Sequence, residues 1–306
     1  MGITLGIIGY GEVGSIFARG LQGRKGVDAI VAWDLRFAEP GQSASARDSA
    51  AADGIEALDG MAALCARADL IISAVTASNT HSVALEAARH ARPGTRFLDL
   101  NSASPGTKQK AAAALEAAHV HYVEAGVMTS VPPYGIRVPM LLGGPHATHL
   151  ATMLMDWGMD AKVVSDQLGV ASAIKMSRSV MIKGLEALVI ESYATARHYG
   201  VEAHVLPTLQ ETFPQIDWIK QGAYFFSRVV QHGRRRAEEM REAALTVQEA
   251  GFEPIMTAAI ARKQDWVAQQ ARAGAFTGLD ANASWESYAD RLPKHETDTR
   301  SAEASK

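Results

Sequence analysis

The sequence predicts an α/β N-terminal domain followed by an all-α C-terminal domain, joined by a long interdomain helix. Three observations lead to this prediction. Short apolar runs alternate with alanine-rich helical segments through about the first 165 residues. After Gly169 the strand pattern stops and helical patterns continue. The first of these, 170–198, would be about 42 Å long, which is enough to cross from one domain to another.

The chain has 306 residues, enough for two domains with separate cores. We expect a first domain at 1–166, a helical substrate and dimerisation domain at 167–292, and a polar mobile tail at 293–306. The first domain has seven predicted strands: 3–8, 29–33, 70–75, 96–100, 120–123, 139–142 and 161–164. Strands that alternate with helices are typical of a doubly wound, largely parallel sheet, in which ligands bind outside the carboxyl ends of the strands.

A glycine-rich turn with the spacing G-x-G-x-x-G follows the first predicted strand and precedes a helical pattern. Gly9 permits the tight turn, Gly11 lets the backbone approach a pyrophosphate, and Gly14 lets the helix pack closely on the strand. The context predicts a Rossmann-type dinucleotide-binding domain, and a plain βα turn is the weaker alternative. Six residues of the turn are predicted to contact the cofactor: Gly9, Tyr10, Gly11, Glu12, Val13 and Gly14.

Asp34 stands at the end of the second predicted strand, where a carboxylate accepts hydrogen bonds from ribose hydroxyls and repels a 2′-phosphate. This position predicts NAD as the cofactor. Arg36 could instead receive that phosphate, so NADP remains open. The alternative is that Asp34 only caps a loop and Arg36 is a solvated charge. Ala74, Val75 and Asn101, at the ends of two further strands, complete the predicted cofactor site.

Composition excludes several other classes of function. The net charge of −3 gives no electrostatic reason to expect nucleic acid or an acidic membrane surface as a partner. No stretch is apolar enough to span a bilayer, and the first residues predict a strand instead of a signal peptide, so we expect a cytoplasmic protein. Cys65 is the single cysteine and reads as a buried structural thiol. His119 and His121 could share a strand face, but without an evident third ligand no metal site is predicted.

The long helix carries a polar stripe. Lys175, Ser179, Lys183 and Glu186 fall within roughly 80° of one another, opposite a mainly apolar side. Periodicity alone favours a stripe that faces solvent, and the neighbouring sequence favours one that faces a cleft. Gly200 is expected to end this helix with a left-handed residue. Four more helices are predicted: 201–212, 215–233, 234–250 and 253–273.

The chain resembles the β-hydroxyacid dehydrogenase superfamily, which includes 3-hydroxyisobutyrate, tartronate semialdehyde and 6-phosphogluconate dehydrogenases. Four segments carry the resemblance: the glycine turn 9–14, Leu98–Pro105, Glu124–Val127 leading through Pro139 to Gly143-Gly144, and Gly169–Lys175. The resemblance implies an NAD(P)-dependent enzyme that oxidises or reduces the CH–OH group of a hydroxy acid or sugar acid. It makes Lys175 the general acid and base toward the substrate hydroxyl. A lysine beside another cation can have its pKa lowered enough for that role.

The resemblance also implies a site for a small anionic substrate. Its predicted residues are Ser102, Met128, Thr129, Ser130, Ser179 and Lys183. Ser102 reads alternatively as a helix N-cap. Three departures from the family matter. Ser179 replaces the usual asparagine, Met128-Thr129-Ser130 replaces the usual serine–glycine–glycine substrate turn, and Ile182 stands where phosphogluconate enzymes have an acid. Without that acid, we expect no assisted decarboxylation.

The C-terminal half resembles a distinct helical domain of bacterial phosphogluconate-dehydrogenase-like proteins, through 232–242 and 251–256. Within it, 234–239 reads as an exposed helix with Arg–Glu pairs at i,i+4. Alternatively, His232 or one arginine reaches the cleft and binds the anionic substrate. The family's helical domain implies a homodimer, and the aromatic segment 224–226 would pack in the core or against a second subunit. The alternatives to a dehydrogenase are an imine reductase-like enzyme, although such enzymes usually lack the lysine, and a non-catalytic nicotinamide-binding protein.

Overall fold

A computed structural model describes residues 2–280 and 282–293 of the chain. They pack as two compact units, which we describe separately. The sheet unit contains 2–180 and 238–257, and the helical unit contains 181–237 and 258–293. The predicted mobile tail lies outside the described residues except for Pro293. The predicted domain boundary between residues 166 and 167 stays a prediction.

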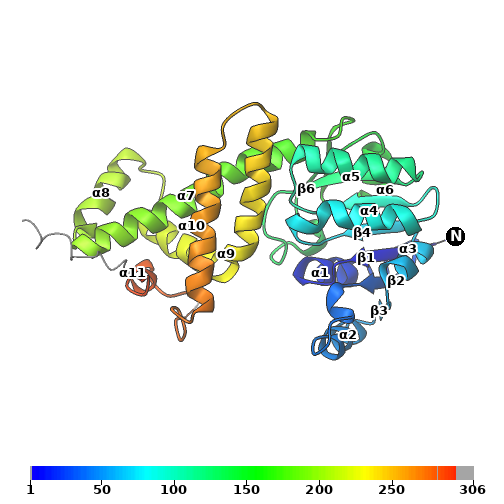
Figure 1. The fold of residues 1–306 in the computed structure, drawn as a ribbon, viewed down its shortest axis with the longest axis horizontal. Helices are drawn as coiled ribbons and strands as arrows, with labels where there is room; N and C mark the ends of the chain where they lie inside the picture. The colour runs from blue at the N-terminus through cyan, green and yellow to red at the C-terminus, as the bar shows by residue number, and fades with distance from the viewer. Residues whose placement is uncertain (1, 281, 294–306) are drawn as a thin grey trace, which may run out of the picture. The chain divides into compact units, whose positions relative to one another are not determined.

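In the described part of the sheet unit, eight strands form one sheet in the order β3-β2-β1-β4-β5-β6-β7-β8 (Figure 1). The strands are β1 (Ile3–Ile8), β2 (Val27–Trp33), β3 (Glu56–Ala57), β4 (Leu70–Ser73), β5 (Arg96–Asp99), β6 (His121–Val127), β7 (Met140–Gly143) and β8 (Ala161–Ser165). Neighbouring strands are parallel except for the antiparallel pair β6 and β7. The predicted doubly wound, largely parallel sheet is confirmed. The short edge strand β3 was not predicted.

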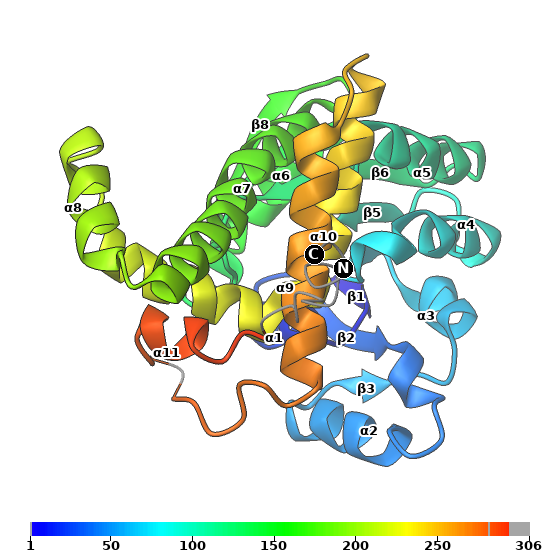
Figure 2. The same cartoon turned by 60° about the vertical axis from the view of Figure 1, so that its left-hand side comes forward.

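Helices cover both faces of this sheet. They are α1 (Glu12–Leu21), α2 (Ser43–Ala52), α3 (Met61–Arg67), α4 (Thr80–His90), α5 (Pro105–Ala117) and α6 (Ala147–Asp156), with short 3-10 turns η1 (Leu35–Phe37), η2 (Ala77–Asn79) and η3 (Gly135–Arg137). One core contains Phe17 of α1 and Leu154 of α6, and the other contains Leu64 of α3 and Leu115 of α5. Figure 2 shows α3, α4 and α5 side by side in one layer. Cys65 lies fully buried in that second core, as predicted.

The remaining helices are α7 (Val170–Tyr199), α8 (Glu202–Thr212), α9 (Trp218–Glu249), α10 (Ile255–Arg272) and α11 (Trp285–Ala289). Gly200 follows α7 with a φ of +67°, as predicted for a left-handed helix end. The core of the helical unit joins Tyr193 of α7, Phe226 of α9 and Trp285 of α11. In the described chain, no helix combines the length and apolar character needed to span a membrane.

The predicted break between residues 233 and 234 is wrong, because α9 runs continuously through both. Gly233 instead allows a close approach to α10. A Cβ at Gly233 would lie 2.8 Å from the carbonyl oxygen of Gln264 and 3.1 Å from the Cβ of Ala268. Glycine costs helix stability in isolation, so the sequence alone favoured a break. In the folded protein, Gly233 is explained by the close packing of α9 against α10.

Candidate functional site

The glycine turn has the geometry that a dinucleotide requires. Gly9 has a φ of +89°, and a Cβ there would lie 2.6 Å from the Ala74 carbonyl oxygen. A Cβ at Gly14 would lie 1.9 Å from the Gly9 carbonyl oxygen, so only glycine permits this contact between turn and helix. Beyond the two neighbours of Gly11 in the chain, no described atom lies within 4 Å of a Cβ built on this residue. The turn therefore leaves open space at Gly11, beside the N-terminal amides of α1, where a pyrophosphate would fit.

Tyr10 contributes to this turn through its backbone. Its ring is buried in the sheet unit, and its hydroxyl donates a hydrogen bond to Asp53 at 2.7 Å. Burial, together with the neighbouring carboxylate, raises the pKa of Tyr10 well above its usual value. The backbone amide of Tyr10 donates a hydrogen bond to Asp34.

Asp34 and Arg36 form one paired group at the carboxyl end of β2. Asp34 accepts hydrogen bonds from the backbone amides of Tyr10 at 2.7 Å and Arg36 at 2.9 Å, and from the Arg36 Nε at 2.9 Å. Burial opposes ionisation of Asp34, but the bonds and charge of Arg36 outweigh it, so the pKa of Asp34 is lowered. Asp34 thus does cap η1, and Arg36 is more than a solvated charge. The two side chains that would discriminate NAD from NADP are in direct contact.

Asn101 ties the ends of two strands together. Its Oδ1 accepts the Val75 amide at 2.7 Å, and its Nδ2 donates to the Ser73 hydroxyl at 3.0 Å. Asn101, Ala74 and Val75 therefore meet at the edge of the sheet that carries Gly9. The alternative interpretation of Ser102 as an N-cap is wrong. Ser104 caps α5, accepting the Thr107 amide with its side chain.

Beneath Asn101 lies a buried charged group that the sequence did not reveal. Asp99 pairs with Lys108 at 2.8 Å, accepts the Tyr122 hydroxyl at 2.7 Å, and accepts the Asn101 amide at 2.9 Å. Burial and the Asp99 charge raise the pKa of Tyr122 well above its usual range. These bonds fix the backbone at the predicted cofactor residue Asn101. A lysine on an alanine-rich helix gives no sequence signal that it points inward.

The segments that carry the family resemblance on β6 and α7 meet in the structure. Glu124 is fully buried and accepts the amides of Gly169 at 2.8 Å and Ala171 at 3.1 Å, and the Ser172 hydroxyl at 2.8 Å. It thereby satisfies donors at the start of α7. Two residues further along β6, a Cβ on Gly126 would lie 3.4 Å from the Cβ of Lys175. The half-buried Lys175 therefore sits over the carboxyl end of β6.

The polar stripe of α7 faces the protein interior, and the solvent-facing alternative is wrong for most of it. Ser179, Lys183 and Glu186 are buried, whereas Met181 and Leu188 on the apolar side are more than half exposed. Periodicity could not show this inversion, because it identifies two faces without stating which one is covered.

Glu186 anchors the stripe within the helical unit. It forms a salt bridge with Arg236 in which Nε lies 2.8 Å from Oε2, and Gln264 donates to the same oxygen at 3.3 Å. Burial raises the pKa of Glu186, even though Arg236, Lys183 and Arg228 oppose that rise. Arg236 is therefore buried, which corrects the expectation that the whole basic run is an exposed helix.

The other predicted substrate residues are distributed as follows. Met128 and Ser130 are half-buried and Thr129 is exposed, in the loop that follows β6. Met128 donates its amide to the Pro139 carbonyl at 2.9 Å, which holds this loop at the carboxyl end of the strand. Ser179 belongs to the sheet unit and Lys183 to the helical unit, so their common role in one site stays a prediction.

The second half of α9 belongs to the sheet unit and holds the start of α5 with two carboxylates. Glu242 accepts the Ser104 amide at 2.8 Å, and Glu249 accepts the Ser104 hydroxyl at 2.8 Å and the Gly106 amide at 2.9 Å. These contacts link residues far apart in the sequence, and no local pattern indicated them. They stabilise the N-terminus of the helix that follows Asn101.

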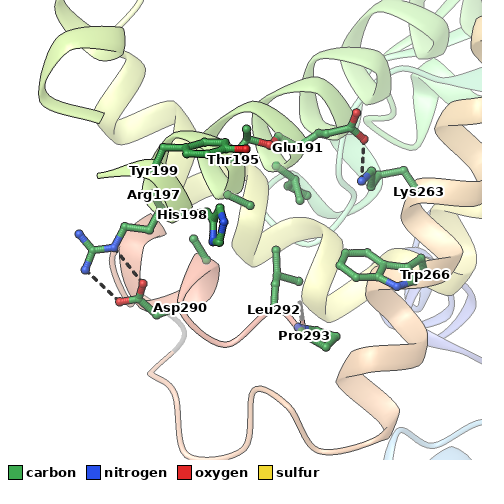
Figure 3. Close-up of a pocket in the computed structure, with 13 residues that line it drawn as sticks. Glu191, Thr195, Arg197, His198, Tyr199, Lys263, Trp266, Asp290, Leu292 and Pro293 are labelled. Atoms are coloured by element: carbon green, nitrogen blue, oxygen red, sulfur yellow. Dashed lines mark hydrogen bonds and ion pairs between the residues drawn. The ribbon is translucent and has the colours of Figure 1, made fainter. Parts of the chain in front are cut away.

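A hollow of about 400 Å³ lies in the helical unit (Figure 3). Its walls come from α7, α10 and the region of α11, with an ion pair between Glu191 and Lys263 and another between Arg197 and Asp290. The predicted site residues do not line it. All of its lining residues belong to the helical unit, so it does not include the glycine turn.

Comparisons with known proteins agree with this geometry. The family described as the NAD binding domain of 6-phosphogluconate dehydrogenase matches residues 4–148, and a domain of unknown function (DUF1932) matches residues 196–267. A conserved hypothetical protein from Sinorhizobium meliloti 1021 is 40% identical, with 95% of this chain and 97% of that chain covered and a TM-score of 0.73.

Two further solved structures bear on the family. A conserved protein of unknown function, reported to be structurally similar to 3-hydroxyacid dehydrogenases, is 31% identical; 89% of this chain and 98% of that chain are covered, with a TM-score of 0.66. The 3-hydroxyisobutyrate dehydrogenase of Mycobacterium tuberculosis shares the fold, with a TM-score of 0.68 at 17% identity over 96% of this chain and 100% of that chain. The chain therefore belongs to the β-hydroxyacid dehydrogenase superfamily and carries an NAD(P)-binding Rossmann domain followed by a helical region.

Proposed function

We propose that this protein is an NAD(P)-dependent oxidoreductase that interconverts a CH–OH group and a carbonyl group in a hydroxy acid or sugar acid. The observation that supports this proposal best is the position of Lys175. Its Cβ lies against Gly126 at the carboxyl end of β6, the edge of the sheet that also carries the glycine turn and Asn101. In open α/β sheets, this edge is where ligands bind.

The bound nicotinamide supplies a hydride acceptor or donor at the substrate carbon. Lys175 accepts the hydroxyl proton during oxidation and returns it during reduction, so that no free alkoxide forms. Asn101 ties the ends of β4 and β5 together through Ser73 and Val75, and it would contact the nicotinamide ribose. Ile182 offers no proton to an enol, so the reaction ends at the carbonyl without assisted decarboxylation.

A panel of 2- and 3-hydroxy acids and sugar acids, assayed for NADH or NADPH formation, tests this proposal. Lys175→Ala should abolish turnover and leave NADH affinity, measured by fluorescence titration, within about twofold. Lys162→Ala is the matched control, since Lys162 is an exposed lysine of β8, and it should behave as wild type. Full turnover by Lys175→Ala would refute the lysine mechanism. Nucleotide binding without turnover on any substrate would favour a non-catalytic protein, and activity confined to cyclic imines would favour an imine reductase.

We further propose that the substrate is a small anion and that the helical unit forms a homodimer. Support for the dimer comes from exposed apolar side chains on that unit, including Met181, Leu188 and Tyr224. Such side chains on a helical surface are typical of subunit contacts. Light scattering should give twice the monomer mass, and Met181→Glu with Leu188→Glu should shift it to the monomer mass. A monomeric wild-type protein would refute this part of the proposal.

A further inference from the structure

Two histidines and a glutamate meet at the edge of the sheet where the parallel strands begin. Glu116 lies in the last turn of α5, His121 is the first residue of β6, and His146 is the N-cap of α6. One imidazole nitrogen from each histidine and one carboxylate oxygen all lie within 4.8 Å of one another. All three residues belong to the sheet unit.

The sequence shows no evident third ligand near His119 and His121, whereas the structure places Glu116 and His146 next to His121. His121 gathers its neighbours from α5 and from the turn before α6, which the antiparallel pairing of β7 with β6 brings to the start of β6. His119 is outside the cluster: it is exposed and has a φ of +57° in the turn before the strand. Sequence spacing therefore pointed to the wrong pair of histidines.

The distances in the cluster are close to those of a metal centre. The Nε2 of His146 lies 3.2 Å from the Oε1 of Glu116, and the rings of His121 and His146 are 4.3 Å apart between centroids. Ligands about 2.1 Å from a tetrahedral Zn²⁺ are about 3.4 Å from one another. Small rotations of the side chains would thus place all three ligand atoms around one ion.

The protein already orients these groups. The Tyr122 amide donates to the Oε1 of Glu116 at 2.8 Å, which is the kind of outer contact that fixes a metal-binding carboxylate. The His121 amide donates to the Thr95 carbonyl at 2.9 Å and anchors the residue to β5. The Nδ1 atom of His121 is buried and has no hydrogen-bond partner among the described residues. An unsatisfied buried nitrogen is costly and calls for a ligand.

We propose that Glu116, His121 and His146 bind one divalent transition-metal ion, with Zn²⁺ as the best match. Two imidazoles and one carboxylate form a donor set that suits this ion and leaves a fourth position for water. The Glu116 and His146 side chains are each 35% exposed, which gives the ion a path from solvent. The bound ion links α5, β6 and α6 at the edge opposite the glycine turn, so this site is separate from the proposed dehydrogenase chemistry.

Isothermal titration of tag-free, metal-stripped protein with Zn²⁺ tests the proposal. We expect binding to saturate at one equivalent, and Co²⁺ to give the visible absorption bands of a four- or five-coordinate site. His121→Ala and His146→Ala should each weaken Zn²⁺ binding by roughly 100-fold or more. His149→Ala is the matched control, because His149 is exposed on the same helix α6 as His146, and its affinity should equal that of wild type.

Glu116→Gln keeps an oxygen for the Tyr122 amide while removing the anionic ligand, so it tests ligation in a variant that folds. It should also lower the affinity at least tenfold, with an unchanged circular dichroism spectrum in the metal-free state. Two results would overturn the proposal. One is the absence of Zn²⁺ binding to the wild-type protein. The other is an affinity that the His121, His146 and Glu116 variants leave unchanged, which would locate the metal elsewhere.

Discussion

Removal of the Glu124 carboxylate should destabilise the protein strongly, because this one side chain satisfies three donors at the start of α7. In Glu124→Ala, the amides of Gly169 and Ala171 lose their acceptor in a fully buried position, and the Ser172 hydroxyl is left with the Gly169 carbonyl at 3.1 Å. A hydrogen bond to a charged group contributes about 1.5–3 kcal/mol, and loss of a helix cap costs about 0.5–2 kcal/mol. Because such contributions do not add fully, we expect the free energy of unfolding to fall by about 3–5 kcal/mol.

Glu124→Gln separates hydrogen bonding from charge. The amide oxygen can still accept both backbone N–H groups. Its NH₂ group can donate to the Ser172 oxygen, and the Ser172 hydroxyl can then give its single hydrogen to the Gly169 carbonyl, which lies 3.1 Å away. The remaining loss is the interaction of the negative charge with the helix N-terminus, about 1 kcal/mol.

Urea unfolding followed by circular dichroism gives both values, provided the slopes stay equal to that of wild type. A third variant provides an independent check. A Cβ at Gly143 would lie 2.5 Å from the Oε1 of Glu124, so Gly143→Ala should also destabilise the protein by displacing that carboxylate. The reasoning is refuted if Glu124→Ala loses less than about 1 kcal/mol, or if Glu124→Gln loses as much as Glu124→Ala.

Three further predictions follow from the geometry. Gly11→Ala should leave the melting temperature unchanged and weaken NADH binding at least tenfold, measured by fluorescence titration. Gly14→Ala should lower the melting temperature, because its Cβ would meet the Gly9 carbonyl at 1.9 Å. Equal melting temperatures for the two variants would contradict this prediction. Glu186→Ala should lower the free energy of unfolding in urea by about 3–5 kcal/mol, because it leaves Arg236 buried without its carboxylate. Glu186→Leu combined with Arg236→Met should recover most of that loss. A double variant no more stable than Glu186→Ala would count against this account of the buried pair. Burial raises the pKa of Cys65 to about 12, so the thiol should resist a disulfide reagent in native protein at pH 8 and react fully in denaturant. The free energy of unfolding should also decline as the pH rises above about 9, where only the unfolded thiol ionises. Rapid labelling of the native protein would contradict this prediction.

Local sequence patterns predicted the parts of this protein that depend on local physics. The glycine turn needs particular residues at fixed spacing, and the apolar runs of parallel strands are visible without knowledge of their partners. The end of α7 at Gly200 follows for the same reason, because a left-handed residue favours glycine whatever surrounds it.

The contacts that sequence reasoning missed join residues distant along the chain. The pair of Asp99 with Lys108 and the contact of Glu124 with the start of α7 bury charged groups that in isolation would face water. The exposed Glu249 likewise holds the start of α5 from a distant part of the chain. Their residue types are ordinary for exposed positions, so only the three-dimensional arrangement shows that they are paired. The buried polar stripe of α7 was also beyond the reach of local patterns. The sequence of a helix with two distinct faces does not reveal which face packs against the rest of the fold.

The contact between Asp34 and Arg36 has a consequence for how this enzyme family member can choose its nucleotide. If Asp34 and Arg36 meet the adenosine ribose as the sequence predicts, a 2′-hydroxyl would displace the guanidinium from the Asp34 oxygens, and a 2′-phosphate would draw the same guanidinium away from the carboxylate. In either case, hydrogen bonds between Arg36 and Asp34 would be replaced by bonds to the nucleotide, so the number of bonds would not simply increase. Since both nucleotides would break the same pair, a difference between their affinities at this position would come from the contacts that replace it. We therefore expect a substitution of Arg36 to change the affinity for both nucleotides, because it removes the partner that either one would displace.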